Sequence, residues 1–244
     1  MLQRSHKTVS DKTISYTNAI GVRKTKLCRS FDGYLNAVSS KGRTIERKNI
    51  IVLLDGCTNC RDQLLLLLLA ETGFRIGELL GVRYVEDIDY QGCRIRVEPR
   101  VDNENKVRAK YEEDRWAKVS KDTFDILLFY YAKYRKLLRE SEYLFITLSG
   151  EHAGQALTED AVNAMLRRLQ KKTQIKVTSH MLRHYFANER RKNGWSLELI
   201  SQALGHRNLQ TTINYLNISN EELVEASEEL FRKNAALYMA DKLL

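Results

Sequence analysis

The chain contains an unbroken apolar run, Leu64 to Ala70, whose side chains all have to be kept from water. The run is far shorter than the roughly 20 apolar residues of a bilayer-spanning helix. Gly73 follows it closely, and a residue without Cβ readily takes the left-handed conformation that ends a helix. The run therefore predicts a core helix, around which other elements pack on every side.

The residues from about Thr44 onward predict the elements that surround this helix. Residues 94–98 alternate charged and apolar side chains, as half-buried strands do, and a strand near residues 115–119 would face them across a Lys-rich turn. Capping residues predict further helices, starting at Ser120 or Asp122, at Thr158, at Thr178 or Ser179, and at Ser196, the last one ending at Gly205. The helix after Ser120 has an apolar stripe of Phe124, Leu127, Leu128, Tyr131 and Leu138. The predicted fold class is α+β, a mainly helical domain with a small antiparallel sheet.

The charge of the chain favours a polyanionic partner, with nucleic acid as the first candidate. The 244 residues include 40 Lys and Arg against 31 Asp and Glu, a net charge of +9. Residues 1–60 hold eleven of the bases and four of the acids. Most of these bases lie in residues 1–44. We interpret this basic segment either as an arm along DNA phosphates or as a solvated terminus.

The sequence predicts neither a membrane anchor nor a secretory signal. The first thirty residues carry basic side chains without an apolar block, so we expect a cytoplasmic protein. Cys57 and Cys60 form a C-x-x-C pair, but no second Cys or His pair stands at zinc-ligand spacing. The cysteines are therefore expected to be reduced thiols, and no metal site is predicted.

Three short stretches carry side chains suited to phosphodiester chemistry. They are Thr72 to Leu79, His180 to Phe186, and Leu204 to His206, the last followed nine residues later by Tyr215. Two arginines on separate elements can hold both non-bridging oxygens of one phosphate, in a bidentate geometry that lysine cannot supply. Histidines add proton transfer near neutral pH, and a tyrosine oxygen can form a covalent phosphoester. Each residue alone has an ordinary structural role, but together they predict a phosphodiester site.

The order and spacing of these residues resemble the tyrosine recombinases, or phage integrase family, over about residues 45–218. That family's T-G-x-R-x-x-E-L, H-x-L-R-H and L-G-H motifs each have a counterpart here. The resemblance implies the fold of a tyrosine-recombinase catalytic domain. It also implies the following roles: Tyr215 as the nucleophile, Arg75 and Arg183 as the clamp on the scissile phosphate, and His180 and His206 as assisting residues.

The resemblance adds a glutamate and a lysine to the site. Glu78 lies one helical turn from Arg75 and would orient the turn that bears the arginine, or else form a surface ion pair with it. The lysine would protonate the departing 5′ oxygen from the turn between the two strands, which offers Lys106 and Lys110. Because residues 103–110 resemble this turn in transposon-borne integrases, where the lysine follows Arg-Ala, we assign Lys110. Lys106 is the alternative, and a solvated lysine without a role is the ordinary interpretation of either one.

The chain departs from the family's pattern at two places. Asn217 stands where many members have a histidine, two residues after the tyrosine and outside the phosphate shell. Members usually carry a helical core-binding domain ahead of the catalytic one, whereas about 45 residues precede the match here. Because Cys28 to Leu35 resembles the last helix of such a domain, we interpret residues 1–44 as its remnant.

Two further surfaces are expected to contact partners. The helix capped by Thr158 has a basic side that would track DNA phosphates, unless it is only solvated. This side consists of Arg167, Arg168, Lys171 and Lys172. Residues 219–244 predict an acidic C-terminal helix with an apolar side. In the resembling family this segment docks on a neighbouring protomer, and the alternative is that it packs on its own domain.

The function that the resemblance implies is site-specific DNA recombination or integration. Double-stranded DNA would be cut and rejoined through a covalent 3′-phosphotyrosyl intermediate, by four protomers and without metal or ATP. The sequence has no Gly-rich phosphate loop or carboxylate cluster that would favour a cofactor. A type IB topoisomerase, which nicks and reseals DNA with nearly the same residues, is the close alternative. A non-catalytic DNA-binding regulator is the other, because residues 196–215 resemble a helix-turn-helix.

Overall fold

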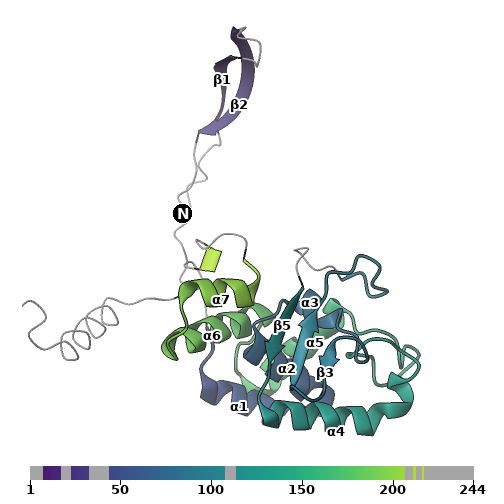
Figure 1. The fold of residues 1–244 in the computed structure, drawn as a ribbon. Helices are drawn as coiled ribbons and strands as arrows, with labels where there is room; N and C mark the ends of the chain where they lie inside the picture. The colour runs from purple at the N-terminus through teal and green to yellow at the C-terminus, as the bar shows by residue number, and fades with distance from the viewer. Residues whose placement is uncertain are drawn as a thin grey trace, which may run out of the picture. The chain divides into compact units, whose positions relative to one another are not determined.

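The computed structural model of the chain describes residues 8–17, 23–32, 44–107, 114–206, 211–212 and 216 (Figure 1). The chain divides into two compact units, Met1–Ser40 and Lys41–Leu244, and each is described by itself. No helix among the described residues is long and apolar enough to cross a membrane.

The described part of the first unit is an antiparallel hairpin. Strand β1 (Thr8–Thr17) pairs with β2 (Arg23–Asp32) along its whole length. Threonine, valine and isoleucine recur along β1, and β-branched residues favour the extended backbone. The helix expected over Cys28 to Leu35 is therefore wrong as far as Asp32, because these residues pair with β1, and residues 33–35 lie outside the described part.

The second unit is built around helix α2 (Cys60–Thr72), which confirms the helix predicted from the leucine run. Asn59 caps its start by accepting a hydrogen bond from the Asp62 N–H, and Gly73 ends it with a φ of 65°. A Cβ at Gly73 would lie 2.4 Å from Cδ1 of Phe186, so a glycine is needed for the close approach of the neighbouring helix as well as for the turn. The fully buried leucines of α2 are Leu64, Leu65, Leu66, Leu68 and Leu69.

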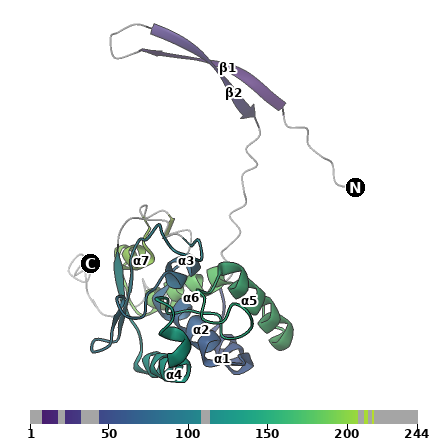
Figure 2. The ribbon, with the colours of Figure 1, turned by 90° about the vertical axis from the view of Figure 1, so that its right-hand side faces the viewer.

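Six further helices among the described residues complete this unit. They are α1 (Arg47–Gly56), α3 (Ile76–Leu80), α4 (Lys121–Leu138), α5 (Glu159–Thr173), α6 (Ser179–Lys192) and α7 (Leu197–Leu204). Helix α2 packs against α1, α4 and α6, and α5 packs against α1 and α3 (Figures 1 and 2). Side-chain oxygens cap the starts of the last four helices and confirm the predicted boundaries, at Ser120, Thr158, Thr178 and Ser196.

The apolar stripe predicted for α4 is confirmed except at Leu128, with Tyr131 half-buried against the core. Phe124, Leu127 and Leu138 are buried, but Leu128 is 42% exposed. Tyr130, outside the predicted stripe, is fully buried and donates a hydrogen bond to the Leu144 carbonyl at 3.0 Å. A tyrosine can be buried in this way because its hydroxyl finds an acceptor there.

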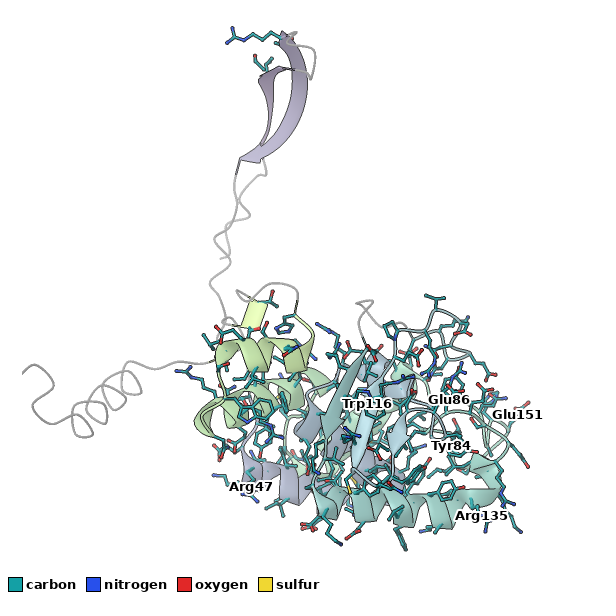
Figure 3. The ribbon with its side chains drawn as sticks, in the orientation of Figure 1. Arg47, Tyr84, Glu86, Trp116, Arg135 and Glu151 are labelled. Atoms are coloured by element: carbon teal, nitrogen blue, oxygen red, sulfur yellow. The ribbon has the colours of Figure 1, made fainter. Side chains whose placement is uncertain are left out.

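A three-stranded antiparallel sheet forms the other structural layer of this unit. Its strands, in order across the sheet, are β3 (Ile88–Asp89), β4 (Arg94–Val97) and β5 (Arg115–Lys118). The register sets Ile95 opposite Ala117 and Arg96 opposite Trp116. Trp116 lies on the outer face, with the guanidinium carbons of Arg94 and Arg96 at 5.5 and 5.8 Å from its ring centroid (Figure 3). Both strands predicted from the sequence, the alternating one and its partner across the turn, are confirmed.

A second, smaller apolar cluster joins α6 to α7 and to the chain beyond α7. It consists of Phe186, Ala187, Ile200, Leu204 and Leu216. Gly205, with a φ of 62°, ends α7 where the sequence predicts it. The chain therefore turns sharply between Leu204 and His206, and this turn carries the candidate site.

Candidate active site

Arg75 is fixed by the carboxylate of Glu78. Arg75 is the N-cap of α3, and its backbone N–H donates to Oε2 of Glu78 at 2.8 Å while its Nη1 donates to Oε1 at 2.9 Å. Only 1% of the Glu78 side chain is exposed, against 23% for Arg75. A buried carboxylate thus holds a guanidinium that still reaches the surface. In a surface ion pair, the alternative interpretation, both side chains would be exposed.

Arg183, on α6, is buried and bonded to backbone carbonyls on two other segments. It is 2% exposed. Its Nη1 donates to the carbonyl of Gly73, just after α2, and its Nη2 donates to the carbonyl of Leu204 at 2.6 Å. The planar fork of a guanidinium suits such a double anchor, which a lysine ammonium on a flexible stem would not reproduce.

The carbonyl of Leu204 brings the two arginines together. Nη1 of Arg75 also donates to it, at 3.4 Å. Leu204 is the last residue of α7, where carbonyls lack helical partners and the helix dipole is negative, so cations are favoured there. Arg75, Arg183 and the adjoining His206, termed the Leu204 cluster below, therefore meet at the end of one short helix.

The ring of His206 is neutral, with its proton on Nδ1. Nη2 of Arg183 lies 3.0 Å from His206 Nε2, and because arginine can only donate, Nε2 accepts. Nδ1 then donates to the hydroxyl of Thr212, 2.9 Å away and fully buried. Burial and, after it, the positive charge of Arg183 lower the pKa of His206 to about 3.

His180 stands beside Arg183, one helical turn away in the first turn of α6. Its ring meets that of His184 edge to face, with the centroids 4.7 Å apart. Burial, followed by the charges of His184 and Arg183, lowers the pKa of His180 below its usual value. The ring is thus partly buried, but the residue as a whole keeps contact with solvent, so it can exchange a proton there.

Arg115 is a third arginine near this cluster and is absent from the residues predicted by the motifs. Its Nη2 donates to Oε2 of Glu78 at 2.8 Å, and 11% of its side chain is exposed. The alternation of side chains along β5 would have identified Arg115 from the sequence. Trp116 and Lys118 face outward, so Arg115 faces inward, where an arginine needs a charged partner.

Residues 43–222, most of the chain, match the sequence profile of the phage integrase family. The chain belongs to this family. The match confirms the resemblance to tyrosine recombinases that the motifs indicated, and the described helices and small sheet confirm the predicted fold class.

Two relatives in the integrase family show how far the similarity extends. Transposase A from transposon Tn554 of Staphylococcus aureus is 33% identical over 222 residues, which cover 84% of this chain and 61% of the transposase. Tyrosine recombinase XerA of Pyrococcus horikoshii is 32% identical over 185 residues, or 75% of this chain and 59% of the recombinase. The chain thus spans about three fifths of the length of these relatives.

Solved structures of recombinases share the fold. The crystal structure of XerA recombinase has a TM-score of 0.62 and 26% identity, and the match covers 79% of this chain and 65% of that one. The Tn1549 transposon integrase, in complex with circular intermediate DNA, also has a TM-score of 0.62, at 18% identity, with 80% and 69% covered. The helical unit described above is therefore an integrase-type fold.

The predicted nucleophile and general acid, Tyr215 and Lys110, lie outside the described residues. The residue after the tyrosine, Leu216, is described and is buried in the α6–α7 cluster. Lys106, the alternative general acid, lies exposed in its turn with a φ of 59°. The roles of all three residues therefore remain predictions from the family's motifs.

The basic side of α5 borders a cavity of its own. Arg167, Arg168, Lys171 and Lys172 are exposed, and Nζ of Lys172 donates to the Gly56 carbonyl at 2.9 Å. Two of them line a cavity of about 410 Å³ between α5 and the junction of α1 with α2, and its lining residues include no member of the Leu204 cluster.

The C-x-x-C pair consists of one partly buried thiol, Cys57, and one buried thiol, Cys60. Cys57 and Cys60 are both free, and Sγ of Cys57 donates to the Leu53 carbonyl. Burial raises the pKa of Cys57 to about 12, which keeps the thiol protonated. Among the described residues, no three His, Cys, Asp or Glu side chains gather as metal ligands do.

Proposed function

We propose that the chain is a site-specific DNA recombinase that cuts and rejoins double-stranded DNA through a covalent 3′-phosphotyrosyl intermediate. The observation that carries the proposal is the convergence of Arg75 and Arg183, from two separate elements, at the Leu204 carbonyl, with His206 bonded to Arg183 beside it. Membership of the integrase family supports the reaction class. The convergence supports the place at which the scissile phosphate binds.

The Leu204 cluster suits a phosphate that gains negative charge during the reaction. A guanidinium carries five N–H donors, so one arginine can hold a backbone carbonyl and a phosphate oxygen at once. Arg183 and Glu78 are buried, so the cluster is fixed before DNA arrives. Donors fixed in this way stabilise the charge that develops in the transition state without having to reorganise.

The proposed cleavage step exchanges one phosphoester for another. The Tyr215 oxygen attacks phosphorus, the bond from phosphorus to the 5′ oxygen breaks, and the DNA keeps a 3′-phosphotyrosyl end. His180, neutral near pH 7 because its pKa is lowered, takes up the tyrosine proton, and Lys110 gives a proton to the departing 5′ oxygen. A 5′ hydroxyl then reverses the step. Because a phosphoester to the tyrosine replaces the one that breaks, the bond energy is conserved, and resealing requires no nucleotide.

The proposed partners are DNA and further copies of the chain. The XerH recombinase and the Tn1549 integrase are known as complexes with their DNA, and a net charge of +9 supports the same class of partner here. Exchange between two duplexes cuts four strands, and each protomer has one Tyr215. Four protomers are therefore expected in the complete assembly.

Covalent capture of DNA tests the proposal. Purified protein is incubated with short duplexes that have a randomised central sequence and one nicked strand, so that cleavage beside the nick releases a fragment and traps the enzyme. Adducts that survive denaturation are isolated, and their DNA is sequenced. We expect a Tyr215-linked adduct on one recurring sequence, formed in the presence of a chelator.

The matched variants are Tyr215→Phe and Tyr185→Phe. Each removes one hydroxyl, but Tyr185 is half-buried on α6, and burial raises the pKa of its hydroxyl. Loss of the adduct in Tyr215→Phe alone supports the proposal. An adduct that persists in Tyr215→Phe overturns it, and adducts spread over unrelated sequences would indicate a topoisomerase instead of a site-specific recombinase.

A further inference from the structure

The side chain of Arg115 is enclosed by groups that belong to the candidate site. Its guanidinium carbon lies 5.6 Å from the ring centroid of Phe74, the residue before Arg75. On another side it meets Gly205, the turn residue between Leu204 and His206. A Cβ at that position would lie 2.3 Å from Nη1 of Arg115, which means that the guanidinium rests directly on the backbone of this turn.

Glu78 joins Arg115 to Arg75 in one buried unit. Its Oε2 accepts from the Arg75 backbone N–H and from Nη2 of Arg115, both at 2.8 Å, and its Oε1 accepts from Nη1 of Arg75 at 2.9 Å. A carboxylate with 1% exposure needs these donors, since a buried charge without partners is costly. Without Arg115, Glu78 would keep a single cationic partner among these contacts, and its position would be less well defined.

The position of Arg115 in the chain gives this unit a second connection. Arg115 is the first residue of β5, and the segment just before it, residues 108–113, contains Lys110. The strand that follows the predicted general acid is therefore tied through Glu78 to Arg75. Through Gly205, the same guanidinium contacts the turn whose Leu204 carbonyl holds Arg183.

We propose that Arg115 is a positioning residue for DNA cleavage, which holds Glu78 and the turn at Gly205 so that the Leu204 cluster keeps the geometry that receives the scissile phosphate. Arg115 acts through Arg75 and the turn. Its Nη2 is engaged by Glu78, and its Nη1 packs on the Gly205 backbone. The inference rests on the proposed function, because it assigns this residue a part in the same cleavage reaction.

Arg115→Met tests the proposal, with Arg94→Met as the matched control. Methionine keeps much of the side-chain volume but removes the donors. Arg94 is also an ion-paired arginine of the same sheet, but it is 54% exposed and its partner is Asp89. Cleavage of the captured nicked duplex is measured in a single turnover, with DNA affinity and thermal unfolding measured separately. We expect a loss of roughly a hundredfold in the cleavage rate of Arg115→Met, with DNA affinity nearly unchanged, and no loss in Arg94→Met.

A substrate with a neutral phosphate separates positioning from a general structural defect. In a methylphosphonate, a methyl group replaces one non-bridging oxygen, so the arginine clamp has less charge to stabilise. If Arg115 acts through the clamp, the ratio of wild-type to Arg115→Met rates falls toward one on this substrate. An unchanged ratio would show a merely structural role and overturn the proposal.

Two further outcomes keep the inference distinct from the proposed function. If the wild type forms no adduct, the proposed function fails first. If the wild type forms the adduct and Arg115→Met forms it equally fast, only the positioning role is refuted.

Should Arg115→Met fail to fold, Arg115→Lys decides, because it keeps the charge and loses the fork. Near-normal cleavage by Arg115→Lys would overturn the proposal.

Discussion

At His206 burial and the neighbouring positive charges together determine the protonation state of the ring. Nε2 accepts from Arg183, and an added proton on that nitrogen would face a guanidinium at 3.0 Å. The charges around the ring come from three elements: Arg75 at the start of α3, Arg115 on β5, and Arg183 and His180 on α6. Folding therefore favours the neutral ring. The cluster can offer its positive charge to a phosphate through the arginines alone.

This arrangement predicts how the stability of the folded protein depends on pH. The pKa of His206 falls from about 6.5 unfolded to about 3 folded, so below pH 6.5 the unfolded chain binds more protons. Stability is complete above pH 6.5 and is lost as the pH falls toward 3. Between pH 6.5 and about pH 5 we expect a loss of about 1 kcal/mol from His206, a value reduced for its partial exposure to solvent. Urea unfolding across this range measures the loss.

His206→Gln is the control for the pH dependence. Glutamine can still accept from Arg183 and donate to Thr212 but does not titrate. The difference in unfolding free energy between pH 7 and pH 5 should therefore be smaller in this variant than in the wild type. Equal slopes in the two proteins would contradict the assigned protonation state.

Lys110 and Lys106 are the two candidates for the general acid that gives one proton to the departing 5′ oxygen. A substrate with sulfur in place of the bridging 5′ oxygen has a leaving group that needs little protonation. Lys110→Ala should lose on the order of a hundredfold in cleavage rate on normal DNA and recover on the sulfur substrate. Lys106→Ala is the matched control, since it changes the same turn. Recovery in Lys106→Ala and not in Lys110→Ala would reverse the assignment.

At the scale of helices, the contact between α2 and α6 depends on Gly73. An alanine there would adopt a φ of 65°, with its Cβ 2.4 Å from the Phe186 ring. Gly194 makes a matched control, because it has a φ of 81° and a Cβ there would meet no atom within 4 Å. We expect Gly73→Ala to lose about 3 kcal/mol of unfolding free energy and Gly194→Ala about 1 kcal/mol, the difference being the cost of overpacking. Similar losses in urea titrations of the two variants would show that the close approach is unimportant.

The elements that could be predicted from the sequence are those whose signals are local. Asn59 and Thr158 begin helices because their side-chain oxygens satisfy N–H groups a few residues on, and Gly205 ends one because it tolerates a left-handed backbone. The hairpin of β1 and β2 was not predicted, since pairing between strands depends on a partner and not on the strand itself. The burial of Tyr130 was missed because the carbonyl that accepts from its hydroxyl, that of Leu144, lies outside the helix.

The residues of the candidate site also divide into those that sequence motifs reveal and those that only the fold reveals. The motifs identified Arg75, Arg183 and His206, whose spacing is visible in the sequence. They did not identify Arg115, because its partner Glu78 is 37 residues away and belongs to another element. Nor does the spacing reveal that the Leu204 carbonyl is the point at which the arginines meet. Contacts between distant segments require the three-dimensional fold.

At the scale of the whole molecule, charge is divided unevenly along the chain. The basic excess lies in residues 1–60, whereas residues 217–244 hold six acids and three bases. Leu216, just before the acidic segment in the sequence, is buried against α6 and α7. A protein with a net charge of +9 repels its copies in solution, and DNA removes that repulsion. Assembly is therefore expected on DNA and not before.

The acidic C-terminal segment is expected to control this assembly. Its sequence predicts a helix after Ser219 with an apolar side, which can be buried on a neighbouring copy once DNA has brought the copies together. Removing residues 220–244 should leave binding to a single captured site unchanged, because the Leu204 cluster stays intact. Complexes on DNA with two sites should become smaller and less cooperative, as measured by sedimentation velocity. If the shortened protein forms full-sized complexes on two-site DNA, the segment packs on its own domain, and contact between copies must come from the helical unit.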